Sequence, residues 1–270
     1  MNMVQSAGIR SIVGDAIAGL PDGNLATAVE QAFEKEQASV NRIEECFEQL
    51  TSRAWSRPTL ERFFHAWRDT HLSAGSVAGM TCRLLALAEK AGAERSHSFK
   101  EAAGQTARII HEDLGLCGET HAELYNRLAT SVCDGDEWEL RRNRVPSAFE
   151  FRNWVHHQRV VARDLQEGLL TTIASEIYNH GEYSMLAPMF NHWLEERLAF
   201  EPEKVQRDIA YIAVHTGGTE SGHFMYGMHA LRHYCEGAGI AVHYPRIEQK
   251  CTEYLSRVGR AFEGIAAALH

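Results

Sequence analysis

The stretch EPEKVQRDIAYIAVHTGGTESGHFMYGMHALRHYCEGAG, Glu201–Gly239, decides which fold the 270-residue sequence indicates. Pro202 stands just inside a helix start, and the acidic residues beside it complement the helix dipole. Apolar residues then recur at helical spacing. His215, Glu220 and His223 interrupt this pattern around a Gly-Gly pair. The stretch therefore predicts helix with polar side chains at its centre that need a partner.

The rest of the chain has the same helical periodicity, and no stretch shows the sustained alternation that is typical of strands. A polar break covers residues 133–146, and there is no internal repeat or low-complexity linker. We therefore predict an all-α fold, a single helical domain over residues 1–270 with about seven to eight helices packed as a bundle. The expected helical segments are residues 24–54, 59–92 (one or two helices), 98–115, 118–132, 147–181, 183–198, 201–239 and 246–270.

Composition and charge narrow the classes of protein. Apolar residues make up 44% and charged residues 23%, and the formal net charge of −9 argues against a nucleic-acid or anionic-membrane partner. No apolar run reaches transmembrane length, and the N-terminal residues lack the pattern of a signal peptide. The six cysteines are scattered without a CxxC motif, which favours reduced thiols. We expect a cytoplasmic protein.

Three stretches place histidine and carboxylate side chains on apolar helices. In the first, IIHEDLGLCGETHAELY (residues 109–125), Glu112 and Asp113 end a helix, glycines form a turn, and His121 opens the next helix. Such side chains can converge on one metal ion. Taken alone, this stretch favours the alternative that both acids are surface residues.

The second candidate is Glu176 in LLTTIASEIYNHG (residues 169–181), which lies on an apolar helix face. Burial of a carboxylate is costly unless it is paired or bound to metal. The alternative is a glutamate that points along the helix to solvent.

In the third stretch, Glu220 and His223 share a helix face as Glu-x-x-His, the pattern of carboxylate-bridged di-iron bundles. His215 lies about two helical turns earlier. The neighbouring glycines weaken a helix, which metal ligation would stabilise, and they leave room for a substrate or O₂. Mixed histidine and carboxylate ligands favour iron or manganese over structural zinc. The alternative is a solvent-facing break between two helices.

The order and spacing of EDLGLCGETH, Glu176 and HTGGTESGH resemble the heme-oxygenase-like di-iron oxidases and oxygenases, relatives of the TenA and pyrroloquinoline-quinone-synthesis helical proteins. The resemblance covers about residues 60–235. It implies the following metal ligands: Glu112 or Asp113, His121, Glu176, His215, Glu220 and His223.

The last motif departs from the family pattern, because four residues separate His215 from Glu220 and the acid is not aspartate. A π-bulge would absorb the extra residue. Without it, His215 leaves the ligand set.

The resemblance implies two Fe(II) ions per chain and an O₂-dependent oxidation of a small amino-acid-like or amine substrate, by N-oxygenation, desaturation or C–C cleavage. An external reductant and a homodimer are further expectations from the family. Arg141, Arg142 and Arg144 are candidates to hold a substrate carboxylate, although a solvated loop is favoured. Glu89 is a candidate supporting carboxylate, although a solvated helix-end acid is favoured.

Two alternatives stay open. One is a haem enzyme of the same fold, in which Gly217 and Gly218 cover the haem. The other is a metal-free TenA-like hydrolase, with Cys133 or Cys235 as the nucleophile, or a binding protein.

Overall fold

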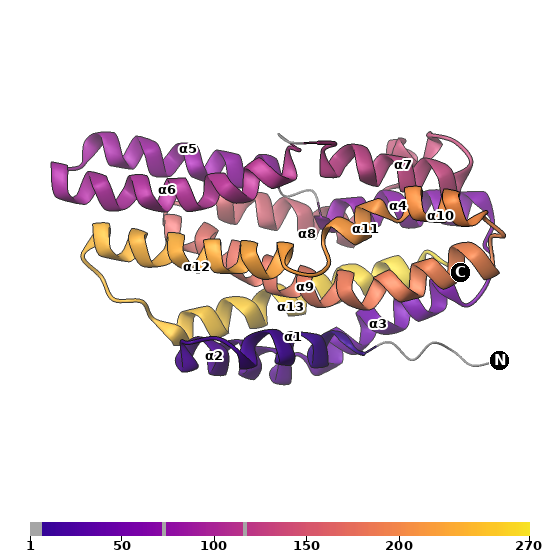
Figure 1. The fold of residues 1–270 in the computed structure, drawn as a ribbon, viewed down its shortest axis with the longest axis horizontal. Coiled ribbons are helices and arrows are strands. Elements are labelled where there is room, and N and C mark those ends of the chain that lie inside the picture. Colours follow the sequence, from indigo (N-terminus) through magenta and orange to yellow (C-terminus); the bar gives the residue numbers. More distant parts are fainter. Residues whose placement is uncertain (1–6, 72–73, 116–117) are drawn as a thin grey trace.

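The computed structural model describes residues 7–71, 74–115 and 118–270, and this part of the chain folds into helices without a strand (Figure 1). The α-helices are α1 (Ile9–Ala18), α2 (Gly23–Lys35), α3 (Gln37–Thr51), α4 (Arg57–His71), α5 (Ala74–Lys90), α6 (Ala93–Asp113), α7 (His121–Cys133), α8 (Pro146–His156), α9 (Leu165–Glu196), α10 (Pro202–Asp208), α11 (Ala210–Val214), α12 (Thr219–Ala238) and α13 (Tyr244–Ala267). Two 3₁₀ turns, η1 (Glu137–Glu139) and η2 (Arg141–Asn143), and a π turn, η3 (His157–Val161), lie between them.

The all-α prediction is confirmed, but the described helices outnumber the seven to eight expected. Residues 24–54 form two helices, because the chain turns at Glu36 between α2 and α3. Residues 201–239 form three helices, α10, α11 and α12. Short breaks of this kind leave the apolar periodicity of the sequence almost unchanged, so periodicity alone does not predict them.

Helix α9 is the central element and packs against α1, α12 and α13 (Figure 1). The sequence predicted a break near Gly181, yet α9 continues through Gly181 and through Pro188. The reason for Gly181 is packing: a Cβ atom there would lie 2.7 Å from Cγ2 of Ile9 and 2.9 Å from Cγ2 of Val13. This glycine lets α1 approach the middle of the bundle.

Aromatic rings join the helices at one end of the core. Phe47 of α3 contacts Trp67 of α4, Phe190 of α9 and Phe262 of α13, with ring centroids 5.7, 6.3 and 5.1 Å apart. All four side chains are fully buried. The contacts of Phe47 with Trp67 and Phe190 are edge-to-face, and such contacts add to the free energy of burial. They fix α4 beside α9, which matters for the cavity described below.

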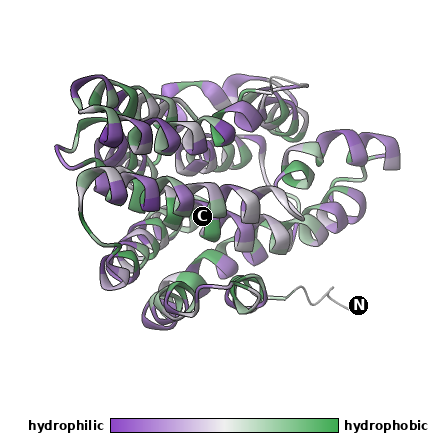
Figure 2. Ribbon diagram, turned by 60° about the vertical axis from the view of Figure 1, so that its left-hand side comes forward, coloured by the Kyte–Doolittle hydropathy of each residue, from purple (hydrophilic) through white to green (hydrophobic). Residues whose placement is uncertain are grey.

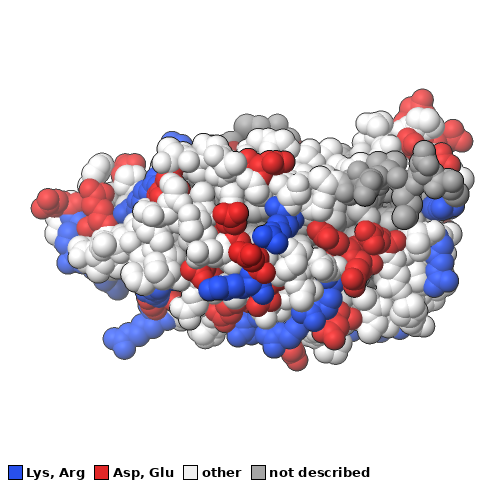
Figure 3. Space-filling view, turned by 90° about the horizontal axis from the view of Figure 1, so that it is seen from below, with Lys and Arg blue, Asp and Glu red and all other residues white. Residues whose placement is uncertain are grey.

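At the other end, α6 packs against α5 and α12 (Figure 1). The end of α6 and the start of α7 thereby face the start of α12. Figure 2 shows hydrophobic and hydrophilic residues alternating along the helices, and the buried side chains are mainly hydrophobic. Acidic and basic side chains are interspersed over the face in Figure 3. No helix in the described ranges has the length and apolar character needed to cross a membrane.

Two glycines within helices give a test of this packing. A Cβ atom at Gly259 of α13 would lie 2.6 Å from Cβ and 3.0 Å from Cα of Ser39, whereas one at Gly104 of α6 would meet nothing within 4 Å. We expect Gly259→Ala to lower the free energy of unfolding by about 1–3 kcal/mol, because the two helices must move apart. The matched variant Gly104→Ala should raise it by up to about 1 kcal/mol through helix propensity. Urea denaturation measures both, and equal effects would contradict the packing described.

Candidate metal centre

The seven sequence-predicted ligands come from five helix segments. Glu112 and Asp113 end α6, and His121 begins α7. Glu176 lies in the middle of α9. The others are His215, at the end of α11, and Glu220 and His223, in the first turns of α12.

The turn between α6 and α7 depends on Gly115, whose φ is +59°. A Cβ atom there would lie 2.4 Å from the carbonyl oxygen of Glu119, so only glycine fits. Thr120 then caps α7 in a reciprocal capping box with Glu123. The helix–turn–helix arrangement predicted for this stretch is confirmed, and it turns His121 back toward the end of α6.

The extra residue between His215 and Glu220 is accommodated by a helix break, so the expected π-bulge was wrong. Helix α11 ends at Val214, Gly217 adopts φ +72°, and α12 begins at Thr219. A left-handed glycine reverses the chain without strain. The expected alternative of a solvent-facing break also fails, because His215 and Glu220 are only 6% and 1% exposed.

Glu176, Glu220 and His223 form the first half of the centre. Their side chains are 3%, 1% and 1% exposed, and one donor atom from each lies within 4.8 Å of the others. Nδ1 of His223 is 3.6 Å from Oε2 of Glu176 and 3.8 Å from Oε2 of Glu220. The three residues surround a common point with ligand atoms.

Asp113, His121 and His215 form the second half. Oδ1 of Asp113 is 3.1 Å from Nδ1 of His121. The imidazole rings of His121 and His215 have centroids 4.3 Å apart. Nε2 of His215 lies 3.7 Å from Oε1 of Glu220. Because the other oxygen of Glu220 faces His223, this carboxylate connects the two halves.

Glu112 and Asp113 are neighbours with different surroundings. Asp113 lines the cavity described below, with its side chain 13% exposed. The Glu112 side chain is 41% exposed, and its Oε2 accepts a hydrogen bond of 2.9 Å from Nε2 of His223. Metal-bound histidines commonly donate their second N–H to such a carboxylate. This arrangement favours Asp113 as the ligand and Glu112 as the residue that orients His223.

His215 has a similar partner. Its Nδ1 donates a hydrogen bond of 2.5 Å to the carbonyl oxygen of Tyr211. This assigns the proton to Nδ1, so Nε2, which faces Glu220, keeps a lone pair that can coordinate a metal. The ring also stacks on Tyr183, with centroids 4.2 Å apart.

Burial makes this group of charges costly unless a cation compensates it. Burial raises the pKa of Glu220 well above its usual range. It acts in the same direction on Glu176, but hydrogen bonding and attraction to His223 hold that pKa at about 2. Burial and the neighbouring His121 lower the pKa of His215 well below its usual range. Oε2 of Glu220 is buried, and no hydrogen-bond partner for it lies in the described part of the chain. Carboxylate and imidazole donors with one orphaned oxygen fit a metal site.

A fully buried arginine, not expected from the sequence, lies behind Glu176. Nη2 of Arg159 donates a 2.7 Å hydrogen bond to Oγ of Ser175, and that hydroxyl lies 3.0 Å from Oε1 of Glu176. Arg159 belongs to the π turn η3. Its charge supports the ionised form of Glu176 from outside the ligand group.

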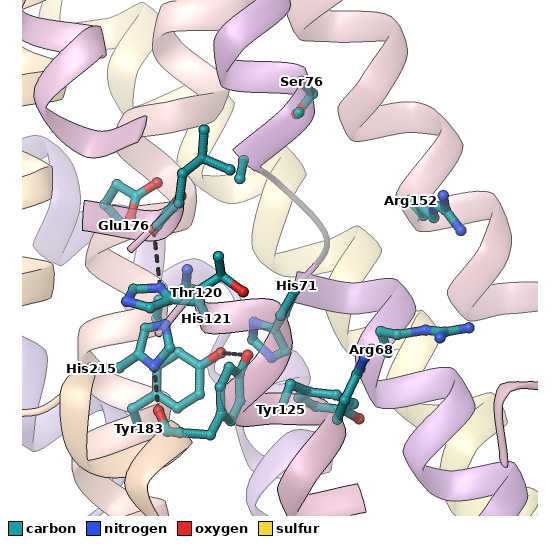
Figure 4. Close-up of a pocket in the computed structure, with 18 of the residues that line it drawn as sticks. Arg68, His71, Ser76, Thr120, His121, Tyr125, Arg152, Glu176, Tyr183 and His215 are labelled. Carbon is teal, nitrogen blue, oxygen red and sulfur yellow. Dashed lines mark hydrogen bonds and ion pairs between the residues drawn. The ribbon is translucent and has the colours of Figure 1, made fainter. Parts of the chain in front are cut away.

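Five of the six residues of the two halves, all except His223, line one wall of a cavity of about 850 Å³. Figure 4 shows His121, His215, Tyr183 and Glu176 on this side, with Arg68 and Arg152 opposite. Sequence reasoning missed a set of residues that line the same cavity: Arg68, His71, Tyr125, Arg152, Asn179, Tyr183 and Tyr211. A signal existed in HAWRDTH, where Arg68 and His71 are three residues apart on an apolar helix.

His71 belongs to a second buried carboxylate network. Its Nε2 is 2.9 Å from Oε1 of Glu182, which also accepts a 2.9 Å hydrogen bond from Nε1 of Trp67. Glu182 is fully buried, and Tyr178 donates to its other oxygen. Nδ1 of His71 has no hydrogen-bond partner within residues 7–71, 74–115 and 118–270. The hydrogen bond to Glu182 therefore fixes the His71 imidazole at the cavity wall through its Nε2 atom.

The other polar candidates lie outside the site. Arg141, Arg142, Arg144 and Glu89 are exposed and do not line the cavity, as favoured from the sequence. Cys133 and Cys235 are buried away from it, and burial raises the pKa of both thiols, that of Cys133 to about 12. Cys117 is outside the described residues.

The raised pKa of Glu220 predicts the behaviour of the metal-free chain. A carboxyl whose folded pKa is raised contributes its full stability below the unfolded pKa, and that contribution is lost as the pH rises. Glu220→Gln should therefore match the unsubstituted chain near pH 4 and exceed its free energy of unfolding by about 1–3 kcal/mol at pH 7. Urea denaturation in the presence of a chelator measures the difference. The exposed control Glu89→Gln should show no such pH dependence, and a destabilised Glu220→Gln at pH 7 would contradict the assignment.

Comparison with known proteins bears on the fold. No protein-family model matches the chain, and no curated protein matches it. Among solved structures, it is similar to a TenA homolog from Pseudomonas syringae pv. tomato, with 14% sequence identity and a TM-score of 0.66 over 98% of this chain and 99% of that one. The chain therefore has a TenA-like helical fold, which confirms the fold implied by the resemblance.

Proposed function

We propose that the chain is a non-haem di-iron enzyme that uses O₂ to oxidise a small amine or amino-acid-like substrate. The observation that supports this proposal most strongly is the group of three histidines and three carboxylates beside the cavity, of which Glu176, His215, Glu220 and His223 are buried. Donors of this kind suit iron. Helical bundles build di-iron sites from carboxylates and histidines on facing helices.

The two halves suggest how the ions would be held. Glu176, Glu220 and His223 would hold one ion, and Asp113, His121 and His215 the other. Glu220 faces both halves and is the candidate to be shared. Two ferrous ions there would supply electrons for the reduction of O₂.

The surrounding residues prepare this chemistry. Glu112 and the Tyr211 carbonyl hold His223 and His215 in the tautomers that direct Nδ1 and Nε2, respectively, at the carboxylates. Second-shell partners of this type typically change metal affinity about 10–100-fold. Tyr183 and Tyr211 are buried beside His215 and hydrogen-bonded through their hydroxyls, 2.5 Å apart. They exclude water from that side of the centre.

The alternatives receive less support from this site. A cysteine nucleophile must reach the substrate, and Cys133 and Cys235 are buried outside the cavity. A haem-binding histidine would have carboxylates as its nearest neighbours here, whereas three carboxylates suit hard cations. Iron loading distinguishes the three functions.

The first test is anaerobic loading with Fe(II) followed by exposure to O₂. We expect about two irons per chain, oxidation of the bound Fe(II) on mixing with O₂, and no Soret band in the absorption spectrum. His223→Ala should remove at least one iron, because it removes the ligand nearest to two carboxylates. The control Arg141→Gln should load normally. Stoichiometry near zero, or one haem per chain, would contradict the proposal.

A second test separates Glu112 from Asp113. Asp113→Asn should lose one of the two irons, because it weakens a direct ligand. Glu112→Gln should retain both irons, with affinity reduced by about 10-fold or less, because the amide oxygen can still accept the bond from His223. Iron titration under anaerobic conditions measures both. The reverse ranking would make Glu112 the ligand.

A further inference from the structure

The cavity wall opposite the ligand group carries two arginines, Arg68 on α4 and Arg152 on α8 (Figure 4). The carboxylates among the described lining residues are Asp113, Glu176 and Glu220, and all of them belong to the ligand group. The charged residues of the cavity are therefore divided, with acids on one side and guanidinium groups on the other.

Arg68 is held by stacking rather than by a close carboxylate. Its guanidinium lies 4.8 Å from the ring centroid of Trp138, and the nearest acidic partner, Glu139, is 3.9 Å away and 48% exposed. Nε of Arg68 is buried and has no hydrogen-bond partner among the residues that the structure describes. Nη2 of Arg68 lies 3.5 Å from Nδ1 of His65, and the side chain is 20% exposed, so the terminal N–H groups of this guanidinium can still donate to a ligand at the cavity wall.

Arg152 is anchored from behind. Its Nη1 donates a 3.0 Å hydrogen bond to Oδ1 of Asp69, whose side chain is 1% exposed. A guanidinium has five N–H donors in a planar fork, and this bond uses one of them. Asp69 is not among the residues that line the large cavity. It therefore positions Arg152 without placing a negative charge at the cavity wall.

The other described lining residues carry no carboxylate or guanidinium group, although His71 and His156 contribute imidazoles. Leu114, Ala122, Tyr125 and Phe149 contribute apolar surface, and Asn126 and Asn153 contribute amides. A ligand with an anionic group at one end and an aliphatic body would complement the two arginines and the apolar part of the lining. Planar bidentate recognition by arginine suits a carboxylate.

We propose that Arg68 and Arg152 form an anion subsite that binds the carboxylate of the substrate, so that the other end of the molecule lies against the ligand group. The ligand class is a small aliphatic or amino-acid monocarboxylate whose reacting carbon or nitrogen is several bonds from the carboxylate. The orientation for reaction rests on the proposed di-iron function, whereas the binding of the anion does not.

The test measures ligand binding to the metal-free full-length chain, with hexanoate as the probe and hexanamide as its neutral match. The readouts are calorimetry and the NMR signals of arginine Nε–H groups. We expect hexanoate to bind at least about 10-fold more tightly than hexanamide and to shift the Arg68 signal. Arg68→Gln should abolish this preference, and the exposed control Arg141→Gln should keep it.

Three results would overturn the subsite. They are equal binding of acid and amide, an unchanged preference in Arg68→Gln, or tighter binding of hexyl phosphate than of hexanoate. The signal of Arg68 in the unsubstituted chain provides the test if the variant does not fold. Iron stoichiometry is measured separately in the same variants. Hexanoate binding without iron loading would refute the di-iron function alone, and normal loading without hexanoate binding would refute the subsite alone.

Discussion

The cost of burying several carboxylates at one point dominates this structure. Glu176 and Glu220 are nearly inaccessible to water, and the side chain of Asp113 is only 13% exposed. Each ionised carboxylate loses its interactions with water on burial, so other groups in the bundle must replace these interactions. His223 and the Arg159–Ser175 pair supply part of them. The orphaned oxygen of Glu220 shows that the protein groups do not supply all of them. A cation fits that deficit, and the surrounding helices are arranged so that their ends meet there.

The sequence predicted the elements of this arrangement better than their contacts. Helical periodicity predicted the all-α fold, and the family resemblance supplied seven candidate ligands, which lie close to one another in the structure. The sequence did not decide between Glu112 and Asp113, because two neighbouring carboxylates at a helix end have the same local pattern. Their separate partners, His223 and His121, depend on how α6 meets α12 and α7.

The arginines on the opposite wall of the cavity were not predicted from the sequence. Arg68 and Arg152 are 84 positions apart (152 − 68), and only the packing of α4 against α8 brings them together. The arginines that did attract attention, in the polar break, are solvated. The break before α12 was also misjudged. A π-bulge and a left-handed glycine both absorb one residue, and the choice depends on the tertiary position of His215.

The pairing of adjacent acids with different histidines has a consequence for how the sequence can change. One residue along an α-helix rotates a side chain by about 100°. Inserting or deleting a single residue near the end of α6 would therefore turn Glu112 away from His223 and Asp113 away from His121 at the same time. The number of residues in the last turn of α6 is therefore fixed by the two histidines that its last two side chains contact.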